Sequence, residues 1–205
     1  KIAIEDNLQG RTWPMLSYDE IKTIVQTAHK RNRRIAAHIS RSKHLSLAIK
    51  AGVDDVNHMI VNYLPDSLIT SMIENDVYWI PTLELWDGVS DYHNIDWDVI
   101  AKNNLTRFVQ AGGKVAIGTD YNGYITSFEM GMPVKEMQLM QESGMTPMQI
   151  IVSGTKHAAH VCDLGNLLGT VEAGKIADII VVEEIPLIDL KALSEVKMVI
   201  HNGET

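Results

Sequence analysis

Short apolar runs rich in β-branched residues alternate with longer segments of helical periodicity from residue 1 to about residue 160. Ser17 and Glu20 have the spacing of a capping box, and apolar residues follow at i, i+3, i+4 and i+7, which predicts a helix over 18–31. The run 34–39 then predicts a strand. Repeated alternation of this kind is typical of βαβ units, so the sequence predicts an α/β fold built on a parallel sheet.

The cycle recurs along the chain and then changes character. Predicted helices cover 42–51, 65–75, 132–143 and 147–161, and predicted strands end near residues 39, 57, 83 and 119. A longer loop with several aromatic residues is predicted over 84–97, ahead of a helix that ends at Gly112-Gly113. After Cys162, glycines punctuate two short predicted strands, 177–183 and 196–201. Residues 163–205 are therefore predicted to form a small β appendage.

Charge and composition exclude several classes of partner. Lys and Arg number 18 against 26 Asp and Glu, a net charge of −8, and the basic cluster at 30–34 ends a predicted helix, so we expect no nucleic-acid partner. No apolar run reaches the roughly 18 residues of a membrane span, and residues 1–9 lack the layout of a signal peptide. The single cysteine, Cys162, is expected to be a buried apolar residue. We expect a cytoplasmic protein that acts on a small molecule.

Three residues that can bind a transition metal lie at the ends of predicted strands: His38, His58 and Asp120. The carboxyl ends of parallel strands form the edge at which barrel enzymes assemble their sites. Imidazole nitrogens and carboxylate oxygens suit Zn²⁺ and related divalent ions, and a water on such an ion becomes acidic enough for a nearby carboxylate to deprotonate. One histidine at a strand end is more often structural than ligating. Three candidates at equivalent positions together favour a metal centre.

Longer motifs place the chain near one group of enzymes. They are residues 17–40, 51–58, 79–83, 112–120, 145–159, 168–182 and 198–203. On these motifs the chain resembles the amidohydrolase superfamily, in the branch that holds imidazolonepropionase and the prolidase-like dipeptidases. The resemblance implies the C-terminal half of a TIM-type (β/α)8 barrel over 1–162, and part of a composite small β-sandwich domain over 163–205.

The resemblance also implies roles for individual residues. His38 would be the metal ligand on barrel strand five and His58 the ligand on strand six. Asp120 would be the strand-eight aspartate that both contacts metal and acts as the general base. Lys1 stands where binuclear members carry a carboxylated lysine that bridges two ions, although a lysine at the start of a chain is by default a solvated end. The implied cofactor is one or two divalent ions, with zinc as the leading choice.

The chain departs from the family pattern in its N-terminal part. The family's first barrel strand carries a His-x-His pair that supplies two more ligands, and no such pair occurs in this sequence. The chain has no initiator Met, and Lys1 opens inside a predicted strand, so we expect either a piece of a longer protein or a chain that a partner completes. Four or five strands cannot close an eight-stranded barrel. The open edge is therefore expected to meet either a missing N-terminal half or a second subunit.

Other polar residues have competing interpretations. His93, in the predicted aromatic loop, is a candidate lid or substrate contact as much as a loop-packing residue. Arg41, like Lys43 beside it, is a candidate contact for a substrate carboxylate, although basic side chains near a helix start are common on surfaces. The remaining histidines are expected at helix surfaces, caps or a terminal strand: His29, His44, His157, His160 and His201.

Three functions remain open at this point. The leading hypothesis is a hydrolase of carbon–nitrogen bonds, either a non-peptide amide such as a cyclic amide or the amide of a dipeptide, that uses a metal-activated water. A deaminase of the same superfamily would attack an amidine carbon and release ammonia. A non-catalytic fragment or interaction module that lacks the His-x-His pair would bind no metal. The sequence does not identify the substrate, because loop shape determines it.

Overall fold

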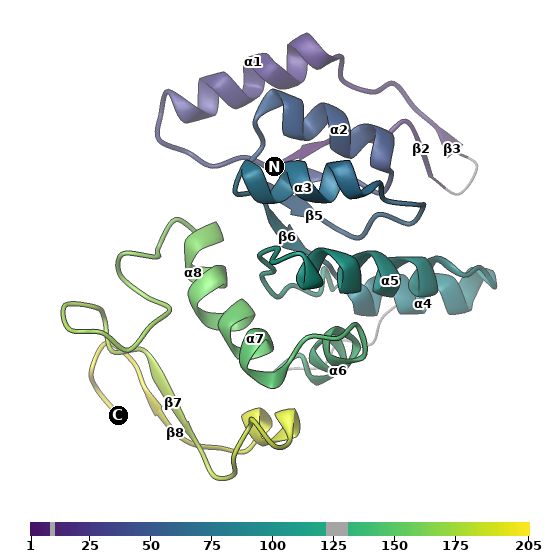
Figure 1. The fold of residues 1–205 in the computed structure, drawn as a ribbon. Coiled ribbons are helices and arrows are strands. Elements are labelled where there is room, and N and C mark those ends of the chain that lie inside the picture. Colours follow the sequence, from purple (N-terminus) through teal and green to yellow (C-terminus); the bar gives the residue numbers. More distant parts are fainter. Residues whose placement is uncertain (9–10, 122–130) are drawn as a thin grey trace.

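The computed structural model describes residues 1–8, 11–121 and 131–205, and its architecture is α/β (Figure 1). A parallel sheet has the strand order β1-β4-β5-β6, with bounds Ile2–Ala3, Ala36–His38, Asp55–Asn57 and Tyr78–Ile80. An isolated parallel bridge between Trp79 and Val115 extends this sheet beyond β6. Two antiparallel pairs are also present, β2 (Asn7–Leu8) with β3 (Arg11–Thr12) and β7 (Ile179–Val182) with β8 (Val196–Ile200).

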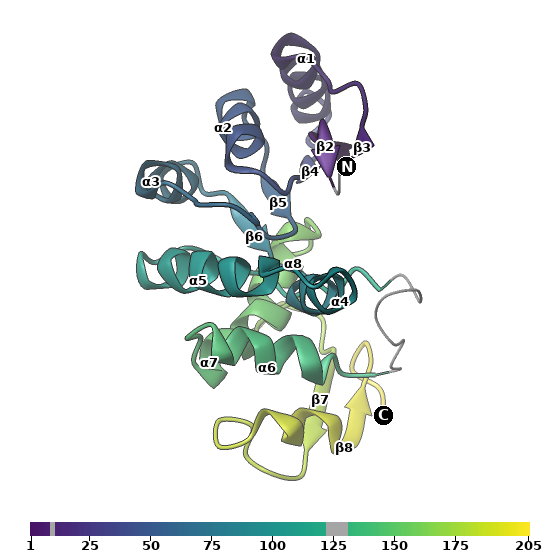
Figure 2. The same ribbon diagram turned by 90° about the vertical axis from the view of Figure 1, so that its right-hand side faces the viewer.

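Helices cover the outer face of the parallel sheet. The described helices are α1 (Tyr18–His29), α2 (Ser42–Ala51), α3 (Asp66–Glu74), α4 (Leu83–His93), α5 (Trp97–Gln110), α6 (Val134–Glu142), α7 (Pro147–Val152) and α8 (Ala158–Val161). Figure 2 shows α1, α2, α3 and α5 fanned along one side of the strands. Both arms of the predicted capping box are present at the start of α1, and Ile21 and Val25 of this helix are buried in the core. The helix predicted over 18–31 is thus confirmed.

The strand register brings the carboxyl ends of the sheet to one level. His38 pairs with Ala3 on one side and with Asn57 on the other, and Asn57 pairs with Ile80. Because all four strands run parallel, the residues that follow these positions emerge at the same edge. Side chains from distant parts of the sequence can therefore converge there.

Helix α4 replaces the aromatic loop predicted over 84–97, and this prediction was wrong. The carboxylate of the buried residue Glu136 accepts hydrogen bonds from the backbone N–H groups of Leu83 (2.9 Å) and Glu84 (2.7 Å), at the first turn of α4. These N–H groups have no partner within a helix, so the Glu136 side chain satisfies them. The residue that stabilises the helix start is 52 positions away from Glu84 in the chain, so local sequence does not reveal it.

The predicted strand over 114–119 is reduced to the single bridge at Val115, and the predicted helix over 147–161 is interrupted by a π-helical turn, Ser153–His157. The two changes are connected. The N–H of Ile117 donates to the carbonyl of Ser153 at 3.2 Å, and the ring of His157 meets the carbonyl of Val115 at 2.8 Å. The π-helical turn therefore provides hydrogen-bond partners for the backbone of Val115 and Ile117, which in a longer sheet would pair with a further strand.

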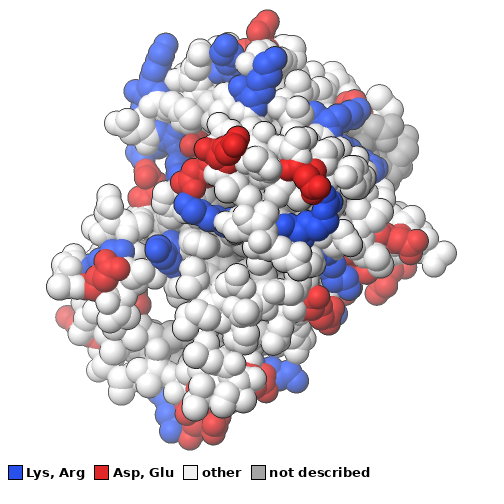
Figure 3. Space-filling model, viewed as in Figure 1, with Lys and Arg blue, Asp and Glu red and all other residues white. Residues whose placement is uncertain are grey.

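The C-terminal residues form a hairpin of β7 and β8 that leaves apolar side chains exposed, among them Val181 and Val199. Cys162, predicted to be buried, is exposed. Acidic and basic side chains are interspersed on the face of the molecule drawn in Figure 3. Among the described residues, every helix is too short or too polar to cross a membrane.

Glu136 makes the stability of the fold depend on pH. Burial raises the pKa of Glu136 to about 8. The hydrogen bonds from the backbone N–H groups of Leu83 and Glu84 act in the opposite direction but are the smaller effect. The folded protein therefore keeps a proton that the unfolded chain releases above a pKa of 4.5, and the free energy of unfolding falls as pH rises from 4.5 to about 8. We expect a slope of up to about 1.4 kcal/mol per pH unit from this group.

Denaturant unfolding at pH 5, 6, 7 and 8 measures that slope. Glu136→Gln is expected to flatten it, because the glutamine cannot release a proton. Glu142→Gln is the matched control, since Glu142 is exposed on the same helix. Equal slopes in the wild type and in Glu136→Gln would contradict the assignment.

Candidate active site

His38 and His58 lie against each other at the carboxyl edge of the parallel sheet. His38 is the last residue of β4, and His58 directly follows β5. Their rings are edge-to-face, with centroids 4.4 Å apart and an angle of 68° between the planes. Two imidazoles that are 20 residues apart in sequence are therefore brought together by the pairing of β4 with β5.

Three interactions fix the position of His58. Its Nδ1 is hydrogen-bonded to Thr82 Oγ1 at 2.9 Å, and its backbone N–H donates to the carbonyl of Ile80 at 2.9 Å. Trp79 Nε1 donates to the carbonyl of His58 at 2.7 Å. Because Nδ1 is engaged by Thr82, Nε2 is the nitrogen that points to Asp120, whose Oδ2 is 3.8 Å away.

The backbone is strained at this edge. His58, Thr82 and Asp120 all have positive φ values, of 73°, 52° and 50°. Residues other than glycine adopt this left-handed conformation at a cost of about 1–3 kcal/mol, and such residues cluster at functional sites. At all three residues the fold keeps an unfavourable backbone conformation, and the side chains that this conformation positions converge at one edge.

Burial keeps both imidazoles neutral. Burial, with smaller contributions from the charges of His38 and Lys1, lowers the pKa of His58 to about 3. Burial also lowers the pKa of His38, an effect that Lys1 reinforces and that Glu5 and Asp120 oppose. Lys1, which is exposed, therefore acts electrostatically on both rings from the first position of the chain. Neutral imidazoles present the lone pairs that a metal ion requires.

The donor set at this edge fits a divalent transition metal. His38 and His58 offer two imidazole nitrogens, and Asp120 offers a carboxylate whose side chain is 53% exposed. Mixed imidazole and carboxylate donors suit Zn²⁺ and its neighbours in the first transition row. The bond from Thr82 to the second ring nitrogen of His58 is the kind of outer contact that orients a metal-ligating imidazole.

Aromatic side chains extend from the histidine pair toward Arg41. The ring of the buried residue Trp86 lies 6.4 Å from that of His58 and 5.7 Å from that of Trp97. The guanidinium of Arg41 lies over Trp97, 5.2 Å from the ring centroid. His93 is exposed at the opposite end of α4 from Thr82, with its ring 4.9 Å from that of Tyr92. Among the described residues, a series of ring contacts links Arg41 to the histidine pair, and no such series links His93 to it.

Several buried polar residues near this edge escaped the sequence analysis. His44, expected on a helix surface, is buried, with Glu5 and Asp6 each 3.2 Å from one of its ring nitrogens. Glu5 follows β1, so the strand-end rule that selected His38 also applies to it. Thr82 and Glu136 gave no comparable signal, because their partners are distant in sequence.

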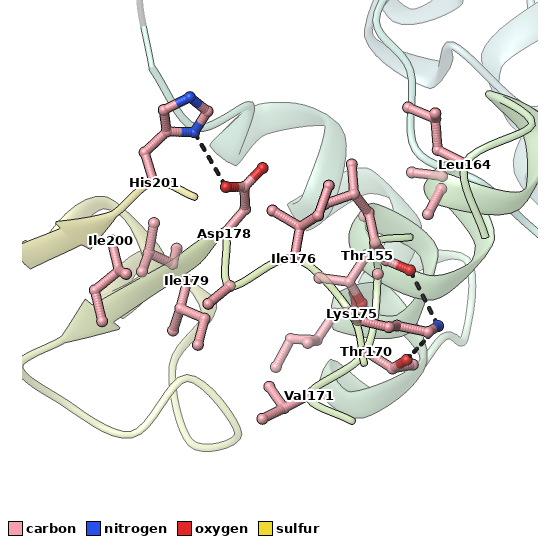
Figure 4. A pocket seen from close by; sticks show the side chains of 18 of the residues that line it. Thr155, Leu164, Thr170, Val171, Lys175, Ile176, Asp178, Ile179, Ile200 and His201 are labelled. Carbon is pink, nitrogen blue, oxygen red and sulfur yellow. Dashed lines mark hydrogen bonds and ion pairs between the residues drawn. The ribbon is translucent and has the colours of Figure 1, made fainter. Parts of the chain in front are cut away.

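A separate apolar cavity of about 910 Å³ lies between α7–α8 and the C-terminal hairpin (Figure 4). Lys175 lines this cavity, and its ammonium group donates hydrogen bonds to Thr170 Oγ1 at 2.6 Å and to the carbonyl of Gly165 at 2.7 Å. None of the residues predicted to bind metal or substrate lines this cavity. Its lining is mostly apolar, and its polar side chains include Lys175 and the ion pair of Asp178 with His201, whose Oδ1 and Nδ1 are 3.1 Å apart.

Comparison with known proteins gives the family. Residues 5–205 match the profile of the amidohydrolase family. The chain belongs to the amidohydrolase family. It is 30% identical over 198 residues to ochratoxinase from Aspergillus niger, which covers 90% of this chain and 40% of that protein. It is 28% identical over 174 residues to an imidazolonepropionase from Caldanaerobacter subterraneus subsp. tengcongensis, covering 81% of this chain and 38% of the relative.

Solved amidohydrolase structures have a similar fold. A Xaa-Pro dipeptidase with methionine in its active site superposes with a TM-score of 0.81 at 28% identity, over 95% of this chain and 50% of that one. The crystal structure of Aspergillus niger ochratoxinase gives a TM-score of 0.80 at 27% identity, over 92% and 45% of the two chains. These neighbours imply a fold of the TIM-barrel type. The chain spans half or less of the length of these relatives.

Proposed function

We propose that this protein is a metal-dependent hydrolase of carbon–nitrogen bonds, with an amide of a dipeptide or another small molecule as its substrate. The observation that carries the proposal is the convergence of His38, His58 and Asp120 at one sheet edge, with both imidazoles held neutral by burial. A bound divalent ion, with zinc as the leading choice, would acidify a water and polarise the substrate carbonyl. The names of the relatives, ochratoxinase and Xaa-Pro dipeptidase, support an amide as the bond that is cleaved.

Each residue has a distinct part in this proposal. His38 and His58 would hold the ion, with Thr82 fixing the ring of His58 so that Nε2 faces Asp120. Asp120 would accept a proton from the attacking water at Oδ2 and return it to the leaving nitrogen. Lys1, once carboxylated, would help to hold a second ion.

The neighbouring side chains would bind the rest of the substrate. The buried ring of Trp86 excludes water from one side of His58. Arg41, held over Trp97, would pair with a carboxylate of the substrate, since guanidinium and carboxylate form bidentate hydrogen bonds. This contact would favour acidic substrates such as a dipeptide with a free C-terminus. His93, the other substrate contact predicted from sequence, is exposed on α4 and is given no role in this proposal.

We also propose that residues 1–162 form the C-terminal half of a (β/α)8 barrel, and that residues 163–205 complete a small β domain with another segment. Four parallel strands and the bridge at Val115 leave a sheet that is open among the described residues. The exposed apolar side chains of β7 and β8 also favour a covering segment. An N-terminal half or a second subunit would supply it.

Metal content and product analysis test the function directly. We expect the full gene product to contain zinc or a related ion and to release amino acids from N-acyl amino acids or dipeptides. His58→Ala is expected to lose both the ion held by His38 and His58 and the activity, whereas His29→Ala, a change at an exposed helix end, should lose neither. Release of ammonia from amidines in place of amide hydrolysis would identify a deaminase. A protein without metal and without turnover would support the non-catalytic alternative.

A further inference from the structure

Glu5, Asp6 and His44 form a second group of side chains with metal-binding chemistry, outside the set assigned above. Glu5 and Asp6 follow β1, and His44 lies in the first turn of α2. Each residue offers one ligand atom, and these atoms all lie within 4.8 Å of one another. We propose that this cluster, called here the Glu5 site, binds a divalent ion of the first transition row.

Buried atoms without hydrogen bonds point to a missing partner. The side chains of His44 and Glu5 are only 1% and 2% exposed. Glu5 Oε1 and both ring nitrogens of His44 form no hydrogen bond with any described residue. Buried polar atoms are nearly always hydrogen-bonded, so three such atoms in one cluster need an explanation. An ion that binds a carboxylate oxygen and an imidazole nitrogen would supply it.

The spacing of these atoms suits shared ligation better than hydrogen bonding. Glu5 Oε1 lies 3.2 Å from His44 Nδ1, and Asp6 Oδ1 lies 3.2 Å from His44 Nε2. Both oxygens are close enough to the ring nitrogens to accept a hydrogen bond. Because no such bond is formed, each oxygen must lie away from the direction in which a ring N–H would point. When an oxygen and an imidazole nitrogen each lie about 2.1 Å from one tetrahedral ion, they are about 3.4 Å apart. The ion then lies in the N–H direction of the ring, and the oxygen lies to one side of it. One ion would take Glu5 Oε1 and one nitrogen, and Asp6 would complete the set.

The carboxylates are already oriented by their second oxygens. Glu5 Oε2 accepts hydrogen bonds from the Ser40 backbone N–H (2.9 Å) and from Ser40 Oγ (2.6 Å). Asp6 Oδ2 is paired with the Lys43 ammonium at 2.6 Å. Each carboxylate thus has one oxygen engaged by the protein and one directed at His44, and outer contacts of this kind orient metal ligands. The side chain of Asp6 is 35% exposed, which gives an ion a route from solvent.

Charge also favours a cation at the Glu5 site. Burial lowers the pKa of His44, which favours the neutral ring, although Glu5 and Asp6 oppose that shift. Two carboxylates beside a neutral ring leave negative charge that Lys43 offsets only in part. The competing explanation is a protonated His44 bridging the two carboxylates with no ion present, and the experiment below separates the two.

The Glu5 site does not depend on the proposed hydrolase function. The charge of Glu5 does raise the pKa of His38, so the two sites are neighbours, and replacing Glu5 would disturb both. The test therefore uses His44→Gln and the more exposed Asp6→Asn, which is expected to fold even where a buried substitution fails.

Zinc binding is measured in the full gene product carrying His58→Ala and Asp120→Asn, which removes ligands of the proposed catalytic centre. After chelator treatment and reloading with Zn²⁺, we expect His44→Gln or Asp6→Asn in this background to lose one further equivalent, or to weaken its binding at least about tenfold. Co²⁺ titration should show the same loss in visible absorption. His29→Gln and Asp91→Asn are the controls, because both residues are exposed and lie outside the cluster.

The outcomes separate the two proposals. Unchanged zinc stoichiometry and affinity in both His44→Gln and Asp6→Asn would overturn the Glu5 site and favour the ion-free triad. A failure of the hydrolase proposal would be seen elsewhere, as an undiminished number of metal equivalents and undiminished activity when His58 alone is replaced. Circular dichroism of each variant checks that a lost equivalent of bound zinc does not result from unfolding.

Discussion

Replacing Asp120 by asparagine is expected to lower kcat for amide hydrolysis by about 10²–10⁴-fold, the usual contribution of a general base. Asparagine keeps the size of the side chain but cannot accept the proton of the attacking water. KM should change much less, because the proposed substrate contact is Arg41, which is held over Trp97 and not by Asp120. Steady-state kinetics of the full gene product with an N-acyl amino acid or a dipeptide measures both constants.

The fold should survive this substitution. The Asp120 side chain is 53% exposed, so Asp120→Asn should unfold at the same denaturant concentration as the wild type. Asp91→Asn, at an exposed position of α4, is the matched control and should retain full turnover. Wild-type kcat in Asp120→Asn would refute the role of this carboxylate as the base.

Trp79→Ala is expected to reduce the free energy of unfolding by about 3–5 kcal/mol, the range for large-to-small substitutions of buried aromatic residues. Trp79 is fully buried in β6, and its ring packs edge-to-face on Phe108 of α5 with centroids 5.1 Å apart. It also joins the sheet to the segment 114–116, since its backbone N–H donates to Lys114 and its carbonyl accepts from Ala116. Equilibrium denaturant unfolding measures the loss.

A second variant separates packing from the contact with the site. Trp79→Phe keeps an aromatic ring but removes the hydrogen bond from Nε1 to the carbonyl of His58, so we expect a smaller loss of stability together with weaker metal binding. Trp13→Ala is the control, since Trp13 is 38% exposed and its replacement should cost less than about 1 kcal/mol. A loss below 1 kcal/mol in Trp79→Ala would show that this ring does not organise the core.

Elements governed by local signals were predictable. The capping box and apolar spacing of α1 lie within 12 consecutive residues; the helix begins where predicted, at Tyr18, and ends at His29, two residues before the predicted end. Gly52 ends α2 in the left-handed conformation, as expected from a glycine after an apolar helix. The strand ends near residues 39 and 57 were also found, because β-branched runs followed by polar residues are a local pattern.

Elements governed by distant partners were not predictable. Helix α4 begins where the Glu136 carboxylate accepts its first N–H groups, and nothing near residue 84 in sequence reveals that contact. The segment around Val115 pairs with Trp79 on one side and with a π-helical turn on the other, so a β-like sequence there did not give a full strand. The burial of His44 likewise depends on the residues that follow β1.

The sequence alone determined the α/β alternation, the strand-end positions of His38 and His58, and the resemblance to the amidohydrolases, because all of these depend on periodicity and motifs along the chain. Only the tertiary structure decided which side chains meet. The contact of His38 with His58, the bond from Thr82 to His58 and the enclosure of His44 by two carboxylates join residues far apart in the chain. Strand register and burial bring these groups together and set their charges, and neither is encoded in any short stretch of sequence.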